Sequence, residues 1–185
     1  MTGVTKFSQV SVFSDLNQLN DISMDKRYNE ICGLTWQEIA DNFEPELKEL
    51  AEDNDLTPEE THETMTRLYD GYHFMFEQEG IFNPFSVLNV LDRCQFDNYW
   101  FKTGTPTFLV ELLKKTDYDL RDIDGVQMAV DGFADYRADV QRPIPVIYQS
   151  GYLTIKGFDP RFRLYTLGFP NEEVKYGFLN FIVPF

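Results

Sequence analysis

Residues 151–174 read GYLTIKGFDPRFRLYTLGFPNEEV and combine the signals of a β-hairpin with those of a helix start. Apolar and polar side chains alternate over residues 151–155 and again over residues 163–167, which is the pattern of two short strands. The Gly-Phe-Asp-Pro segment between them, residues 157–160, predicts the turn. A Pro-Asn-Glu-Glu sequence then begins an expected helix, and residues 144–149 precede the hairpin as a short helix or an extended turn. The order helix, hairpin, helix is compatible with a winged-helix-like unit.

Helix-start signals recur upstream of the hairpin. Thr35 and Thr57 each precede a glutamate by three residues, the capping-box spacing in which a hydroxyl and a carboxylate satisfy free backbone N–H groups. Proline follows a cap residue at Asn83 and at Thr105, where its missing N–H would be unpaired anyway. We expect helices beginning at Trp36 and covering residues 44–53, 58–69, 85–94 and 107–115. The predicted fold class is mainly α with a small β component.

The chain has 185 residues and a formal net charge of −15, and this charge is unevenly placed. Residues 1–60 hold four basic and 14 acidic residues, whereas the last 55 residues hold six of each. With 43% hydrophobic and 16% aromatic residues the chain can build a core. Its acidity argues against a general affinity for nucleic acid or anionic membranes, because phosphate binding needs clustered Lys and Arg. The shift in charge indicates two units, an acidic helical one and a neutral one that carries the hairpin.

No segment has the properties of a membrane span or a targeting signal. The start, MTGVTKFSQV, lacks a basic segment followed by an apolar stretch, and no apolar run approaches about 20 residues. Cys32 and Cys94 fit no metal or redox spacing, so we expect two reduced and mostly buried thiols. These features predict a soluble cytoplasmic protein without a metal site.

Motifs that carry chemistry are scarce. The chain has no phosphate-binding loop, and its two histidines, His62 and His73, are expected at or partly below the surface. Glu-x-Lys triplets at residues 46–48 and 173–175 are similar to a nuclease motif, but both fall on expected helices, so we interpret them as solvated charged faces. The aromatic cluster over residues 72–76 is interpreted as core rather than as a base-stacking platform. No catalytic residue is predicted.

Eight segments, taken together, resemble one family of bacterial proteins. They occur in the family's order and cover essentially the whole chain, and it is their succession that carries the resemblance. The segments are residues 2–8 (TGVTKFS), 14–23 (SDLNQLNDIS), 69–72 (YDGY), 83–86 (NPFS), 99–101 (YWF), 103–106 (TGTP), 149–155 (QSGYLTI) and 167–174 (LGFPNEEV). On these segments the chain resembles the AAA-ATPase-like family, which is abundant in gut Bacteroidetes.

The resemblance implies that the chain is a middle piece of such a protein. In this family an ATPase core comes first, with a phosphate loop and an acidic metal-binding strand, and a PD-(D/E)xK-type nuclease domain usually ends the chain. Residues 1–25 would be a remnant of the ATPase core, residues 26–135 a helical lid-like domain and residues 136–185 the winged-helix-like unit. The nucleotide-sensing residues would be Thr2, Thr5 or Lys6. ATP and magnesium are implied for the full-length family and not for the isolated chain, which lacks the phosphate loop, the acidic strand and the nuclease domain.

Three functional hypotheses follow. The first is a catalytically silent lid and winged-helix-like portion of an ATPase, with a regulatory or interaction role, whose partners are the missing ATPase core and nuclease domain. Without that core an apolar face of the lid would be exposed and would favour self-association. The second is a nucleic-acid-binding winged-helix module that uses Arg161 and Arg163 beside the hairpin turn. The third is a self-standing enzyme, which would need a pocket that gathers His62 or His73 with several carboxylates.

Overall fold

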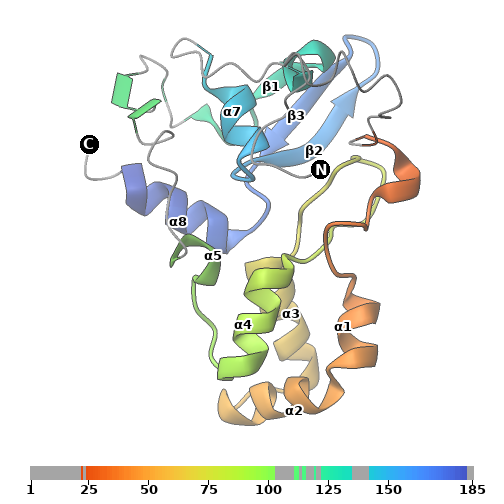
Figure 1. The fold of residues 1–185 in the computed structure, drawn as a ribbon, viewed down its shortest axis with the longest axis vertical. Coiled ribbons are helices and arrows are strands. Elements are labelled where there is room, and N and C mark those ends of the chain that lie inside the picture. Colours follow the sequence, from red (N-terminus) through yellow and green to blue (C-terminus); the bar gives the residue numbers. More distant parts are fainter. Residues whose placement is uncertain are drawn as a thin grey trace, which may run out of the picture.

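Most of the helices lie at one end of the molecule, and the strands lie at the other (Figure 1). The computed structural model describes residue 22 and residues 24–102, 111–112, 114–115, 119, 122–134 and 142–182. Figure 1 shows a group of helices at the lower end, the strands with a helix beside them at the upper end, and further helices between these ends. The fold is mainly α with a small β component, which confirms the predicted fold class. Within the described ranges, every helix is too short or too polar to cross a lipid bilayer.

The helical end is built as the capping signals predict. Its elements are a 3-10 turn η2 (Lys26–Tyr28) and the helices α1 (Trp36–Asn42), α2 (Glu44–Asp53), α3 (Pro58–Tyr69) and α4 (Pro84–Arg93). Both predicted capping boxes form: the Thr35 and Thr57 hydroxyls accept from the N–H three residues on, and the glutamates there accept from the cap residues' own N–H. Asn83 caps α4 by accepting from the Phe85 N–H at 3.0 Å. The helix starts predicted at Thr35, Thr57 and Asn83 are therefore confirmed, and the start predicted at Thr105 lies outside the described residues.

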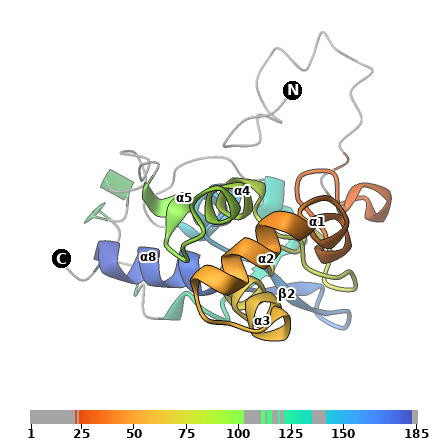
Figure 2. The same cartoon turned by 90° about the horizontal axis from the view of Figure 1, so that it is seen from below.

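One apolar core joins these four helices. We call it the helical core, and its buried members are Ile39, Leu50, Met65, Tyr69, Phe82, Val87, Val90, Leu91 and Tyr99. α2 packs against both α3 and α4, and Figure 2 shows α1 to α4 gathered together when this end is viewed from below. The Tyr69 hydroxyl donates to the Asp97 carbonyl at 3.0 Å, so the one polar atom of this large buried side chain is satisfied.

The opposite end is a three-stranded antiparallel sheet with a helix beside it. Its strands are β1 (Gln127–Ala129), β2 (Thr154–Asp159) and β3 (Leu164–Gly168), in the order β1-β3-β2. A 3-10 turn, η4 (Val130–Ala134), follows β1 and packs against α7 (Ile144–Gln149), which precedes β2. We call the second core the sheet core, and its buried members include Ile123, Met128, Ile147, Ile155, Leu167, Val174 and Phe178.

The predicted hairpin is present, but its turn lies further along the chain than expected. Gly157 and Phe158, predicted in the turn, lie in β2 and pair with β3, after a register shift that follows Ile155. The turn occupies residues 160–163 instead. Asp159 explains this position, because its Oδ1 accepts from the backbone N–H groups two and three residues on, at 2.8 and 3.2 Å. The prediction of the turn at residues 157–160 was wrong for this reason.

Two helices lie between the ends and connect them. α5 (Tyr99–Lys102) follows α4, and α8 (Glu172–Ile182) follows β3. α8 contacts α3 and α5, and it also supplies Val174 and Phe178 to the sheet core (Figure 1). α8 therefore belongs to both ends of the molecule.

The domain boundary expected between residues 135 and 136 lies outside the described residues and stays a prediction. Among the described residues, the last buried member of the helical core is Tyr99 and the first buried member of the sheet core is Leu112. β1 precedes residue 135, yet it pairs with β3 beyond it. Most of the expected core remnant, residues 1–25, lies outside the described residues. Of the helix expected over residues 107–115, the described residues 111, 112, 114 and 115 are helical.

Candidate functional site

A buried carboxylate, Glu173, joins the two ends of the molecule. Its side chain lies in the first turn of α8 and is 0% exposed. One carboxylate oxygen, Oε2, accepts a hydrogen bond from the Ser86 hydroxyl of α4 at 2.7 Å. The other, Oε1, accepts from the Trp100 backbone N–H of α5 at 2.8 Å, and the Tyr99 N–H also donates to this carboxylate. Three donors from α4 and α5 therefore converge on one acceptor group of α8.

Burial and hydrogen bonding act on the ionisation of Glu173 in opposite directions. Burial dominates and raises its pKa, because the charged form loses its hydration, while the three donors lower the pKa. Our interpretation of residues 173–175 as a solvated charged face is therefore wrong for Glu173. It holds for Lys175, which is half-exposed and pairs with Asp124 at 2.9 Å.

The spacing of the buried residues along α8 contains a signal that Glu173 is buried. Over residues 172–180 of this helix, the buried positions are 173, 174, 177 and 178, which form two adjacent rows spaced i, i+4. Val174 and Phe178 mark one row as apolar. Glu173 lies in the neighbouring row, so a helical wheel drawn around the apolar pair would have placed this glutamate at the edge of the buried face.

A second connection lies at the start of α8. Asn171 Oδ1 accepts from the Val174 N–H at 3.1 Å and so caps the helix. The amide nitrogen of the same side chain donates to the Asp70 carbonyl, just after α3, at 2.8 Å. On the surface, Arg67 of α3 forms an ion pair with Glu172 of α8. α3 and α8 are thus joined by a cap residue as well as by a surface ion pair.

The backbone that follows α3 passes directly against the connection between β3 and α8. Gly71 has a φ of +92°, and a Cβ atom on it would lie 2.2 Å from the Pro170 carbonyl oxygen. A side chain is excluded here by the approach of the two backbones as well as by the left-handed conformation. The same carbonyl accepts from Lys156 Nζ of β2 at 3.1 Å. Burial lowers the pKa of Lys156, and the nearby carboxylates of Asp124 and Asp70 oppose this effect.

The segment after Gly71 is fastened to β2. Thr154 Oγ1 accepts from the His73 N–H at 2.6 Å and donates to the His73 carbonyl at 2.9 Å. Tyr72 packs against the sheet core, and its hydroxyl hydrogen-bonds with the Asn83 side chain. The expectation of a core cluster over residues 72–76 is met by Tyr72, whereas Phe76 is 38% exposed.

We call this set of contacts the joint. Five of the eight segments that carry the family resemblance each supply at least one group to it, namely residues 69–72, 83–86, 99–101, 149–155 and 167–174. Glu173, at its centre, accepts from a hydroxyl and from backbone N–H groups, which are neutral donors. Such an arrangement orients α4, α5 and α8 relative to one another, and it is not the pairing of a nucleophile with a base.

The binding residues predicted from the sequence lie away from the joint or outside the described residues. Thr2, Thr5 and Lys6 lie outside them. Arg161 and Arg163 both lie exposed in the turn between β2 and β3. The Arg161 guanidinium lies 5.1 Å from the centre of the Phe162 ring, which is itself 63% exposed. The structure therefore places two cations and one aromatic ring together at the hairpin tip.

The two histidines are partly buried, as expected, and both have neighbours. His62 stacks on Trp36 with ring centroids 3.8 Å apart. His73 Nδ1 lies 3.0 Å from the Gln78 carbonyl, so this nitrogen carries a proton and donates it. The carboxyl of Asp70 lies near both histidines and also near Lys156, and burial raises its pKa. This segment thus brings the Asp70 carboxylate near the histidines.

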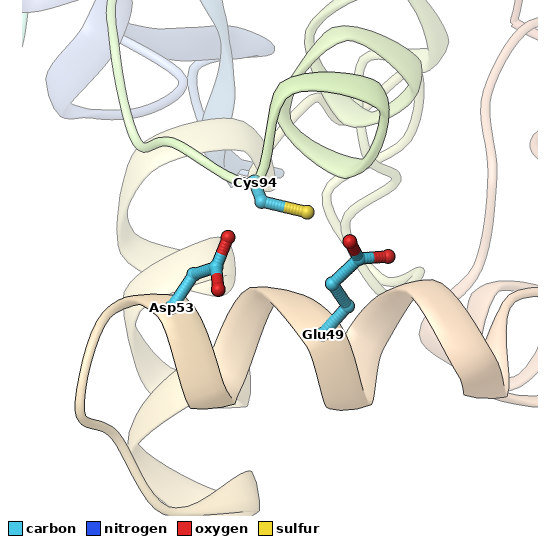
Figure 3. Close-up of side chains that lie close together, drawn as sticks. All are labelled: Glu49, Asp53 and Cys94. Atoms are coloured by element: carbon cyan, nitrogen blue, oxygen red, sulfur yellow. The ribbon is translucent and has the colours of Figure 1, made fainter.

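Three side chains with metal-binding atoms lie together between α2 and the end of α4 (Figure 3). The ligand atoms of Glu49, Asp53 and Cys94 lie within 4.8 Å of one another. Partial burial raises the pKa of the Cys94 thiol, and the nearby carboxylates of Glu49, Asp53 and Asp92 raise it further. Exposed acidic groups commonly lie together without an ion, and within the described residues these three side chains are the whole of the group. We therefore assign no metal to this cluster.

The two cysteines differ in exposure. Cys94 is partly buried, whereas Cys32 is exposed, so the expectation of two mostly buried thiols is wrong for Cys32.

Comparison with known proteins gives a relative that is longer than this chain. The chain is 39% identical over 182 residues to an uncharacterized protein in the vnfD 5′ region of Azotobacter chroococcum mcd 1, and the match covers 95% of this chain and 32% of the relative. The chain thus spans about a third of the length of that protein. No family model and no solved structure matches the chain.

Proposed function

We propose that the chain acts as the non-catalytic lid and winged-helix-like portion of an AAA-ATPase-like protein, with a regulatory or interaction role. The observation that carries this proposal is the joint, in which Glu173 ties the helical end to the helix that completes the sheet core. Closely packed and hydrogen-bonded interfaces have discrete arrangements, so a displacement of the helical end is passed to the hairpin end. That is the property required of a lid that reports on a nucleotide site.

The longer relative is consistent with this role. Because the match covers 32% of the relative, that protein has room for an ATPase core and for a further domain. The partners in this proposal are the ATPase core and the nuclease domain of the parent protein, and its location is the cytoplasm. ATP and magnesium belong to the parent and not to this chain.

The test compares the purified chain with the full-length Azotobacter relative. Each is titrated with ATP in the presence of magnesium in an isothermal titration calorimeter. We expect the relative to bind in the micromolar range and the chain to give no binding heat, because the chain has no phosphate loop. Micromolar binding by the chain itself, or no binding by the relative, would contradict the proposal.

A second candidate, a nucleic-acid-binding winged-helix module, is favoured by the hairpin tip. Arg161 and Arg163 flank an exposed Phe162 there, and cations with an aromatic ring suit a phosphate backbone and a base. The helix before the hairpin argues against this function. α7 contains no basic residue, and its first four residues are buried, so it has little free surface to enter a DNA groove.

A mobility-shift titration with duplex DNA at low salt distinguishes the two candidates. The lid proposal predicts no shift, even where electrostatic attraction is strongest. The alternative predicts a salt-sensitive shift that is lost in the variant with Arg161→Ala and Arg163→Ala. The matched control, with Lys114→Ala and Lys115→Ala, loses the same charge elsewhere and should keep the shift in that case.

A further inference from the structure

An open groove with an apolar floor lies between α2 and α4 on the helical end. It has a volume of about 470 Å³, and we call it the α2–α4 groove; it is lined by Phe43, Glu46, Leu88, Asn89, Leu91 and Asp92. Leu88 is 49% exposed, and Phe85, one turn earlier on α4, is 44% exposed. Helices of a closed bundle normally bury such a stripe, so the outer face of α4 offers apolar surface to a partner.

Two carboxylates, those of Glu46 and Asp92, line this groove, and two more lie close to it. Glu46, Glu49 and Asp53 follow the i, i+3, i+7 spacing of one face of α2. Asp92 lies across from them on α4, and it acts with Glu49 and Asp53 on the Cys94 thiol, which places all three carboxylates near that atom. Figure 3 shows Glu49 and Asp53 pointing from α2 towards the end of α4. We call the four carboxylates the acidic rim.

The basic side chains of α2 and α4 do not neutralise the acidic rim. Lys48 approaches Glu52 at 3.8 Å, and both lie on the other face of α2. The Arg93 guanidinium lies over the Tyr99 ring, 5.4 Å from its centre. Among the described residues, no basic side chain forms an ion pair with a member of the rim. The groove therefore presents negative charge around its apolar surface.

We propose that the α2–α4 groove binds an amphipathic helix of a partner protein, with Lys or Arg residues flanking its apolar face. A third helix that lies along two others can place apolar side chains at i, i+3 or i+4 and i+7 against Phe85, Leu88 and the groove floor. Its flanking cations then meet the carboxylates of the rim, which steers the encounter and fixes orientation.

The charge of the rim decides between this occupant and a second copy of the chain. A second copy packed through the same groove would bring four more carboxylates against the first four, and like charges in contact are unfavourable. The self-association that we expected through an exposed lid face is therefore disfavoured at this face. A basic helix meets both the apolar floor and the rim.

The experiment measures binding of a synthetic leucine-lysine peptide by fluorescence anisotropy. The peptide is about 18 residues long, carries fluorescein, and places its leucines on one helical face. We expect the intact chain to bind it with a micromolar dissociation constant. Leu88→Asp should weaken binding by at least about tenfold, and the same charge change at the equally exposed Leu179 of α8 should leave it within about twofold.

A matched pair of charge reversals tests the rim. The variant with Glu46→Lys and Asp92→Lys should lose at least about tenfold in affinity. The control with Glu59→Lys and Glu63→Lys makes the same change in net charge on the exposed face of α3 and should lose much less. Melting temperatures close to that of the intact chain confirm that each variant is folded, since all of the altered side chains except the partly exposed Glu46 are exposed.

Four results would overturn the proposal. The first is no binding at about 100 μM peptide, and the second is an equal loss of affinity from the test and the control substitutions. The third is equal binding of a scrambled peptide that has no apolar face. The fourth is a dimer, detected by light scattering, that Leu88→Asp converts to a monomer. The last result would assign the groove to a second copy of the chain.

Discussion

Replacement of Glu173 by alanine tests whether the joint stabilises the fold. The substitution removes a carboxylate that is 0% exposed and that accepts hydrogen bonds from the Ser86 hydroxyl and from the Trp100 and Tyr99 N–H groups. These donors lose their acceptor together. Alanine is a good helix former, so the substitution affects the contacts of the joint and not the helix propensity of α8.

The expected loss follows from two opposing contributions. A buried donor left without a partner costs about 1–3 kcal/mol, so three donors set an upper bound of about 9 kcal/mol. Removal of the carboxylate also removes the free-energy penalty of burying a poorly hydrated charge, and this offsets several kcal/mol of that loss. We expect a net loss of about 2–4 kcal/mol, which lowers the melting temperature of a chain of this length by about 5–15 °C.

Urea denaturation followed by circular dichroism measures the loss, and Glu172→Ala is the matched control. Glu172 is the adjacent acidic residue in the same helical turn, but it is exposed and forms only a surface ion pair with Arg67. Its loss should cost no more than about 1 kcal/mol. Equal stabilities of the Glu173→Ala and Glu172→Ala variants would refute the reasoning, because both remove one charge from the N-terminal end of α8.

Three further predictions concern the same region. Burial raises the pKa of Glu173 above its ordinary 4.5, so the folded state binds the proton more tightly than the unfolded chain does. The stability of the unaltered protein relative to the Glu173→Gln variant should therefore fall as the pH rises above 4.5. Urea denaturation of both proteins across that pH range measures this difference. Gly71→Ala should lower the stability by at least about 2 kcal/mol, because the added Cβ would meet the Pro170 carbonyl. Gly125 has a φ of +96° and open space around it, so Gly125→Ala should cost only the strain of the left-handed conformation, about 1 kcal/mol. Thermal melts of the two variants compare these losses. Asn171→Ala removes the cap of α8 and a bond to the backbone after α3, and should lose about 1–3 kcal/mol in the same denaturation assay.

The helical end could be predicted from the sequence because its starting signals are local. The capping boxes at Thr35 and Thr57 involve groups three residues apart, and the structure contains both. β1 could not be predicted in this way. It is only three residues long, only Met128 is buried within it, and its extended conformation depends on pairing with β3, far along the chain.

The contacts of the joint could not be predicted from local signals either, because they join residues that are far apart in the sequence. A glutamate in the first turn of a helix is ordinarily solvated, where it interacts well with the helix dipole. Glu173 is buried because α4 and α5 supply donors to it, and neither helix adjoins α8 in the sequence. Five of the eight segments on which the proposed family resemblance rests meet at the joint, but the resemblance did not reveal which side chains meet.

The span of the joint along the chain has a consequence for the order of folding. Glu173 lies 87 residues from Ser86 and 73 from Trp100, and Asn171 lies 101 residues from Asp70. The buried members of the helical core that the structure describes all precede residue 100, so this part can form during synthesis while α8 is still unmade. Until α8 arrives, the Ser86 hydroxyl and the α5 N–H groups must be satisfied by water. The closure of these long loops is therefore a late step, and the arrival of α8 decides when the helical end is joined to the sheet.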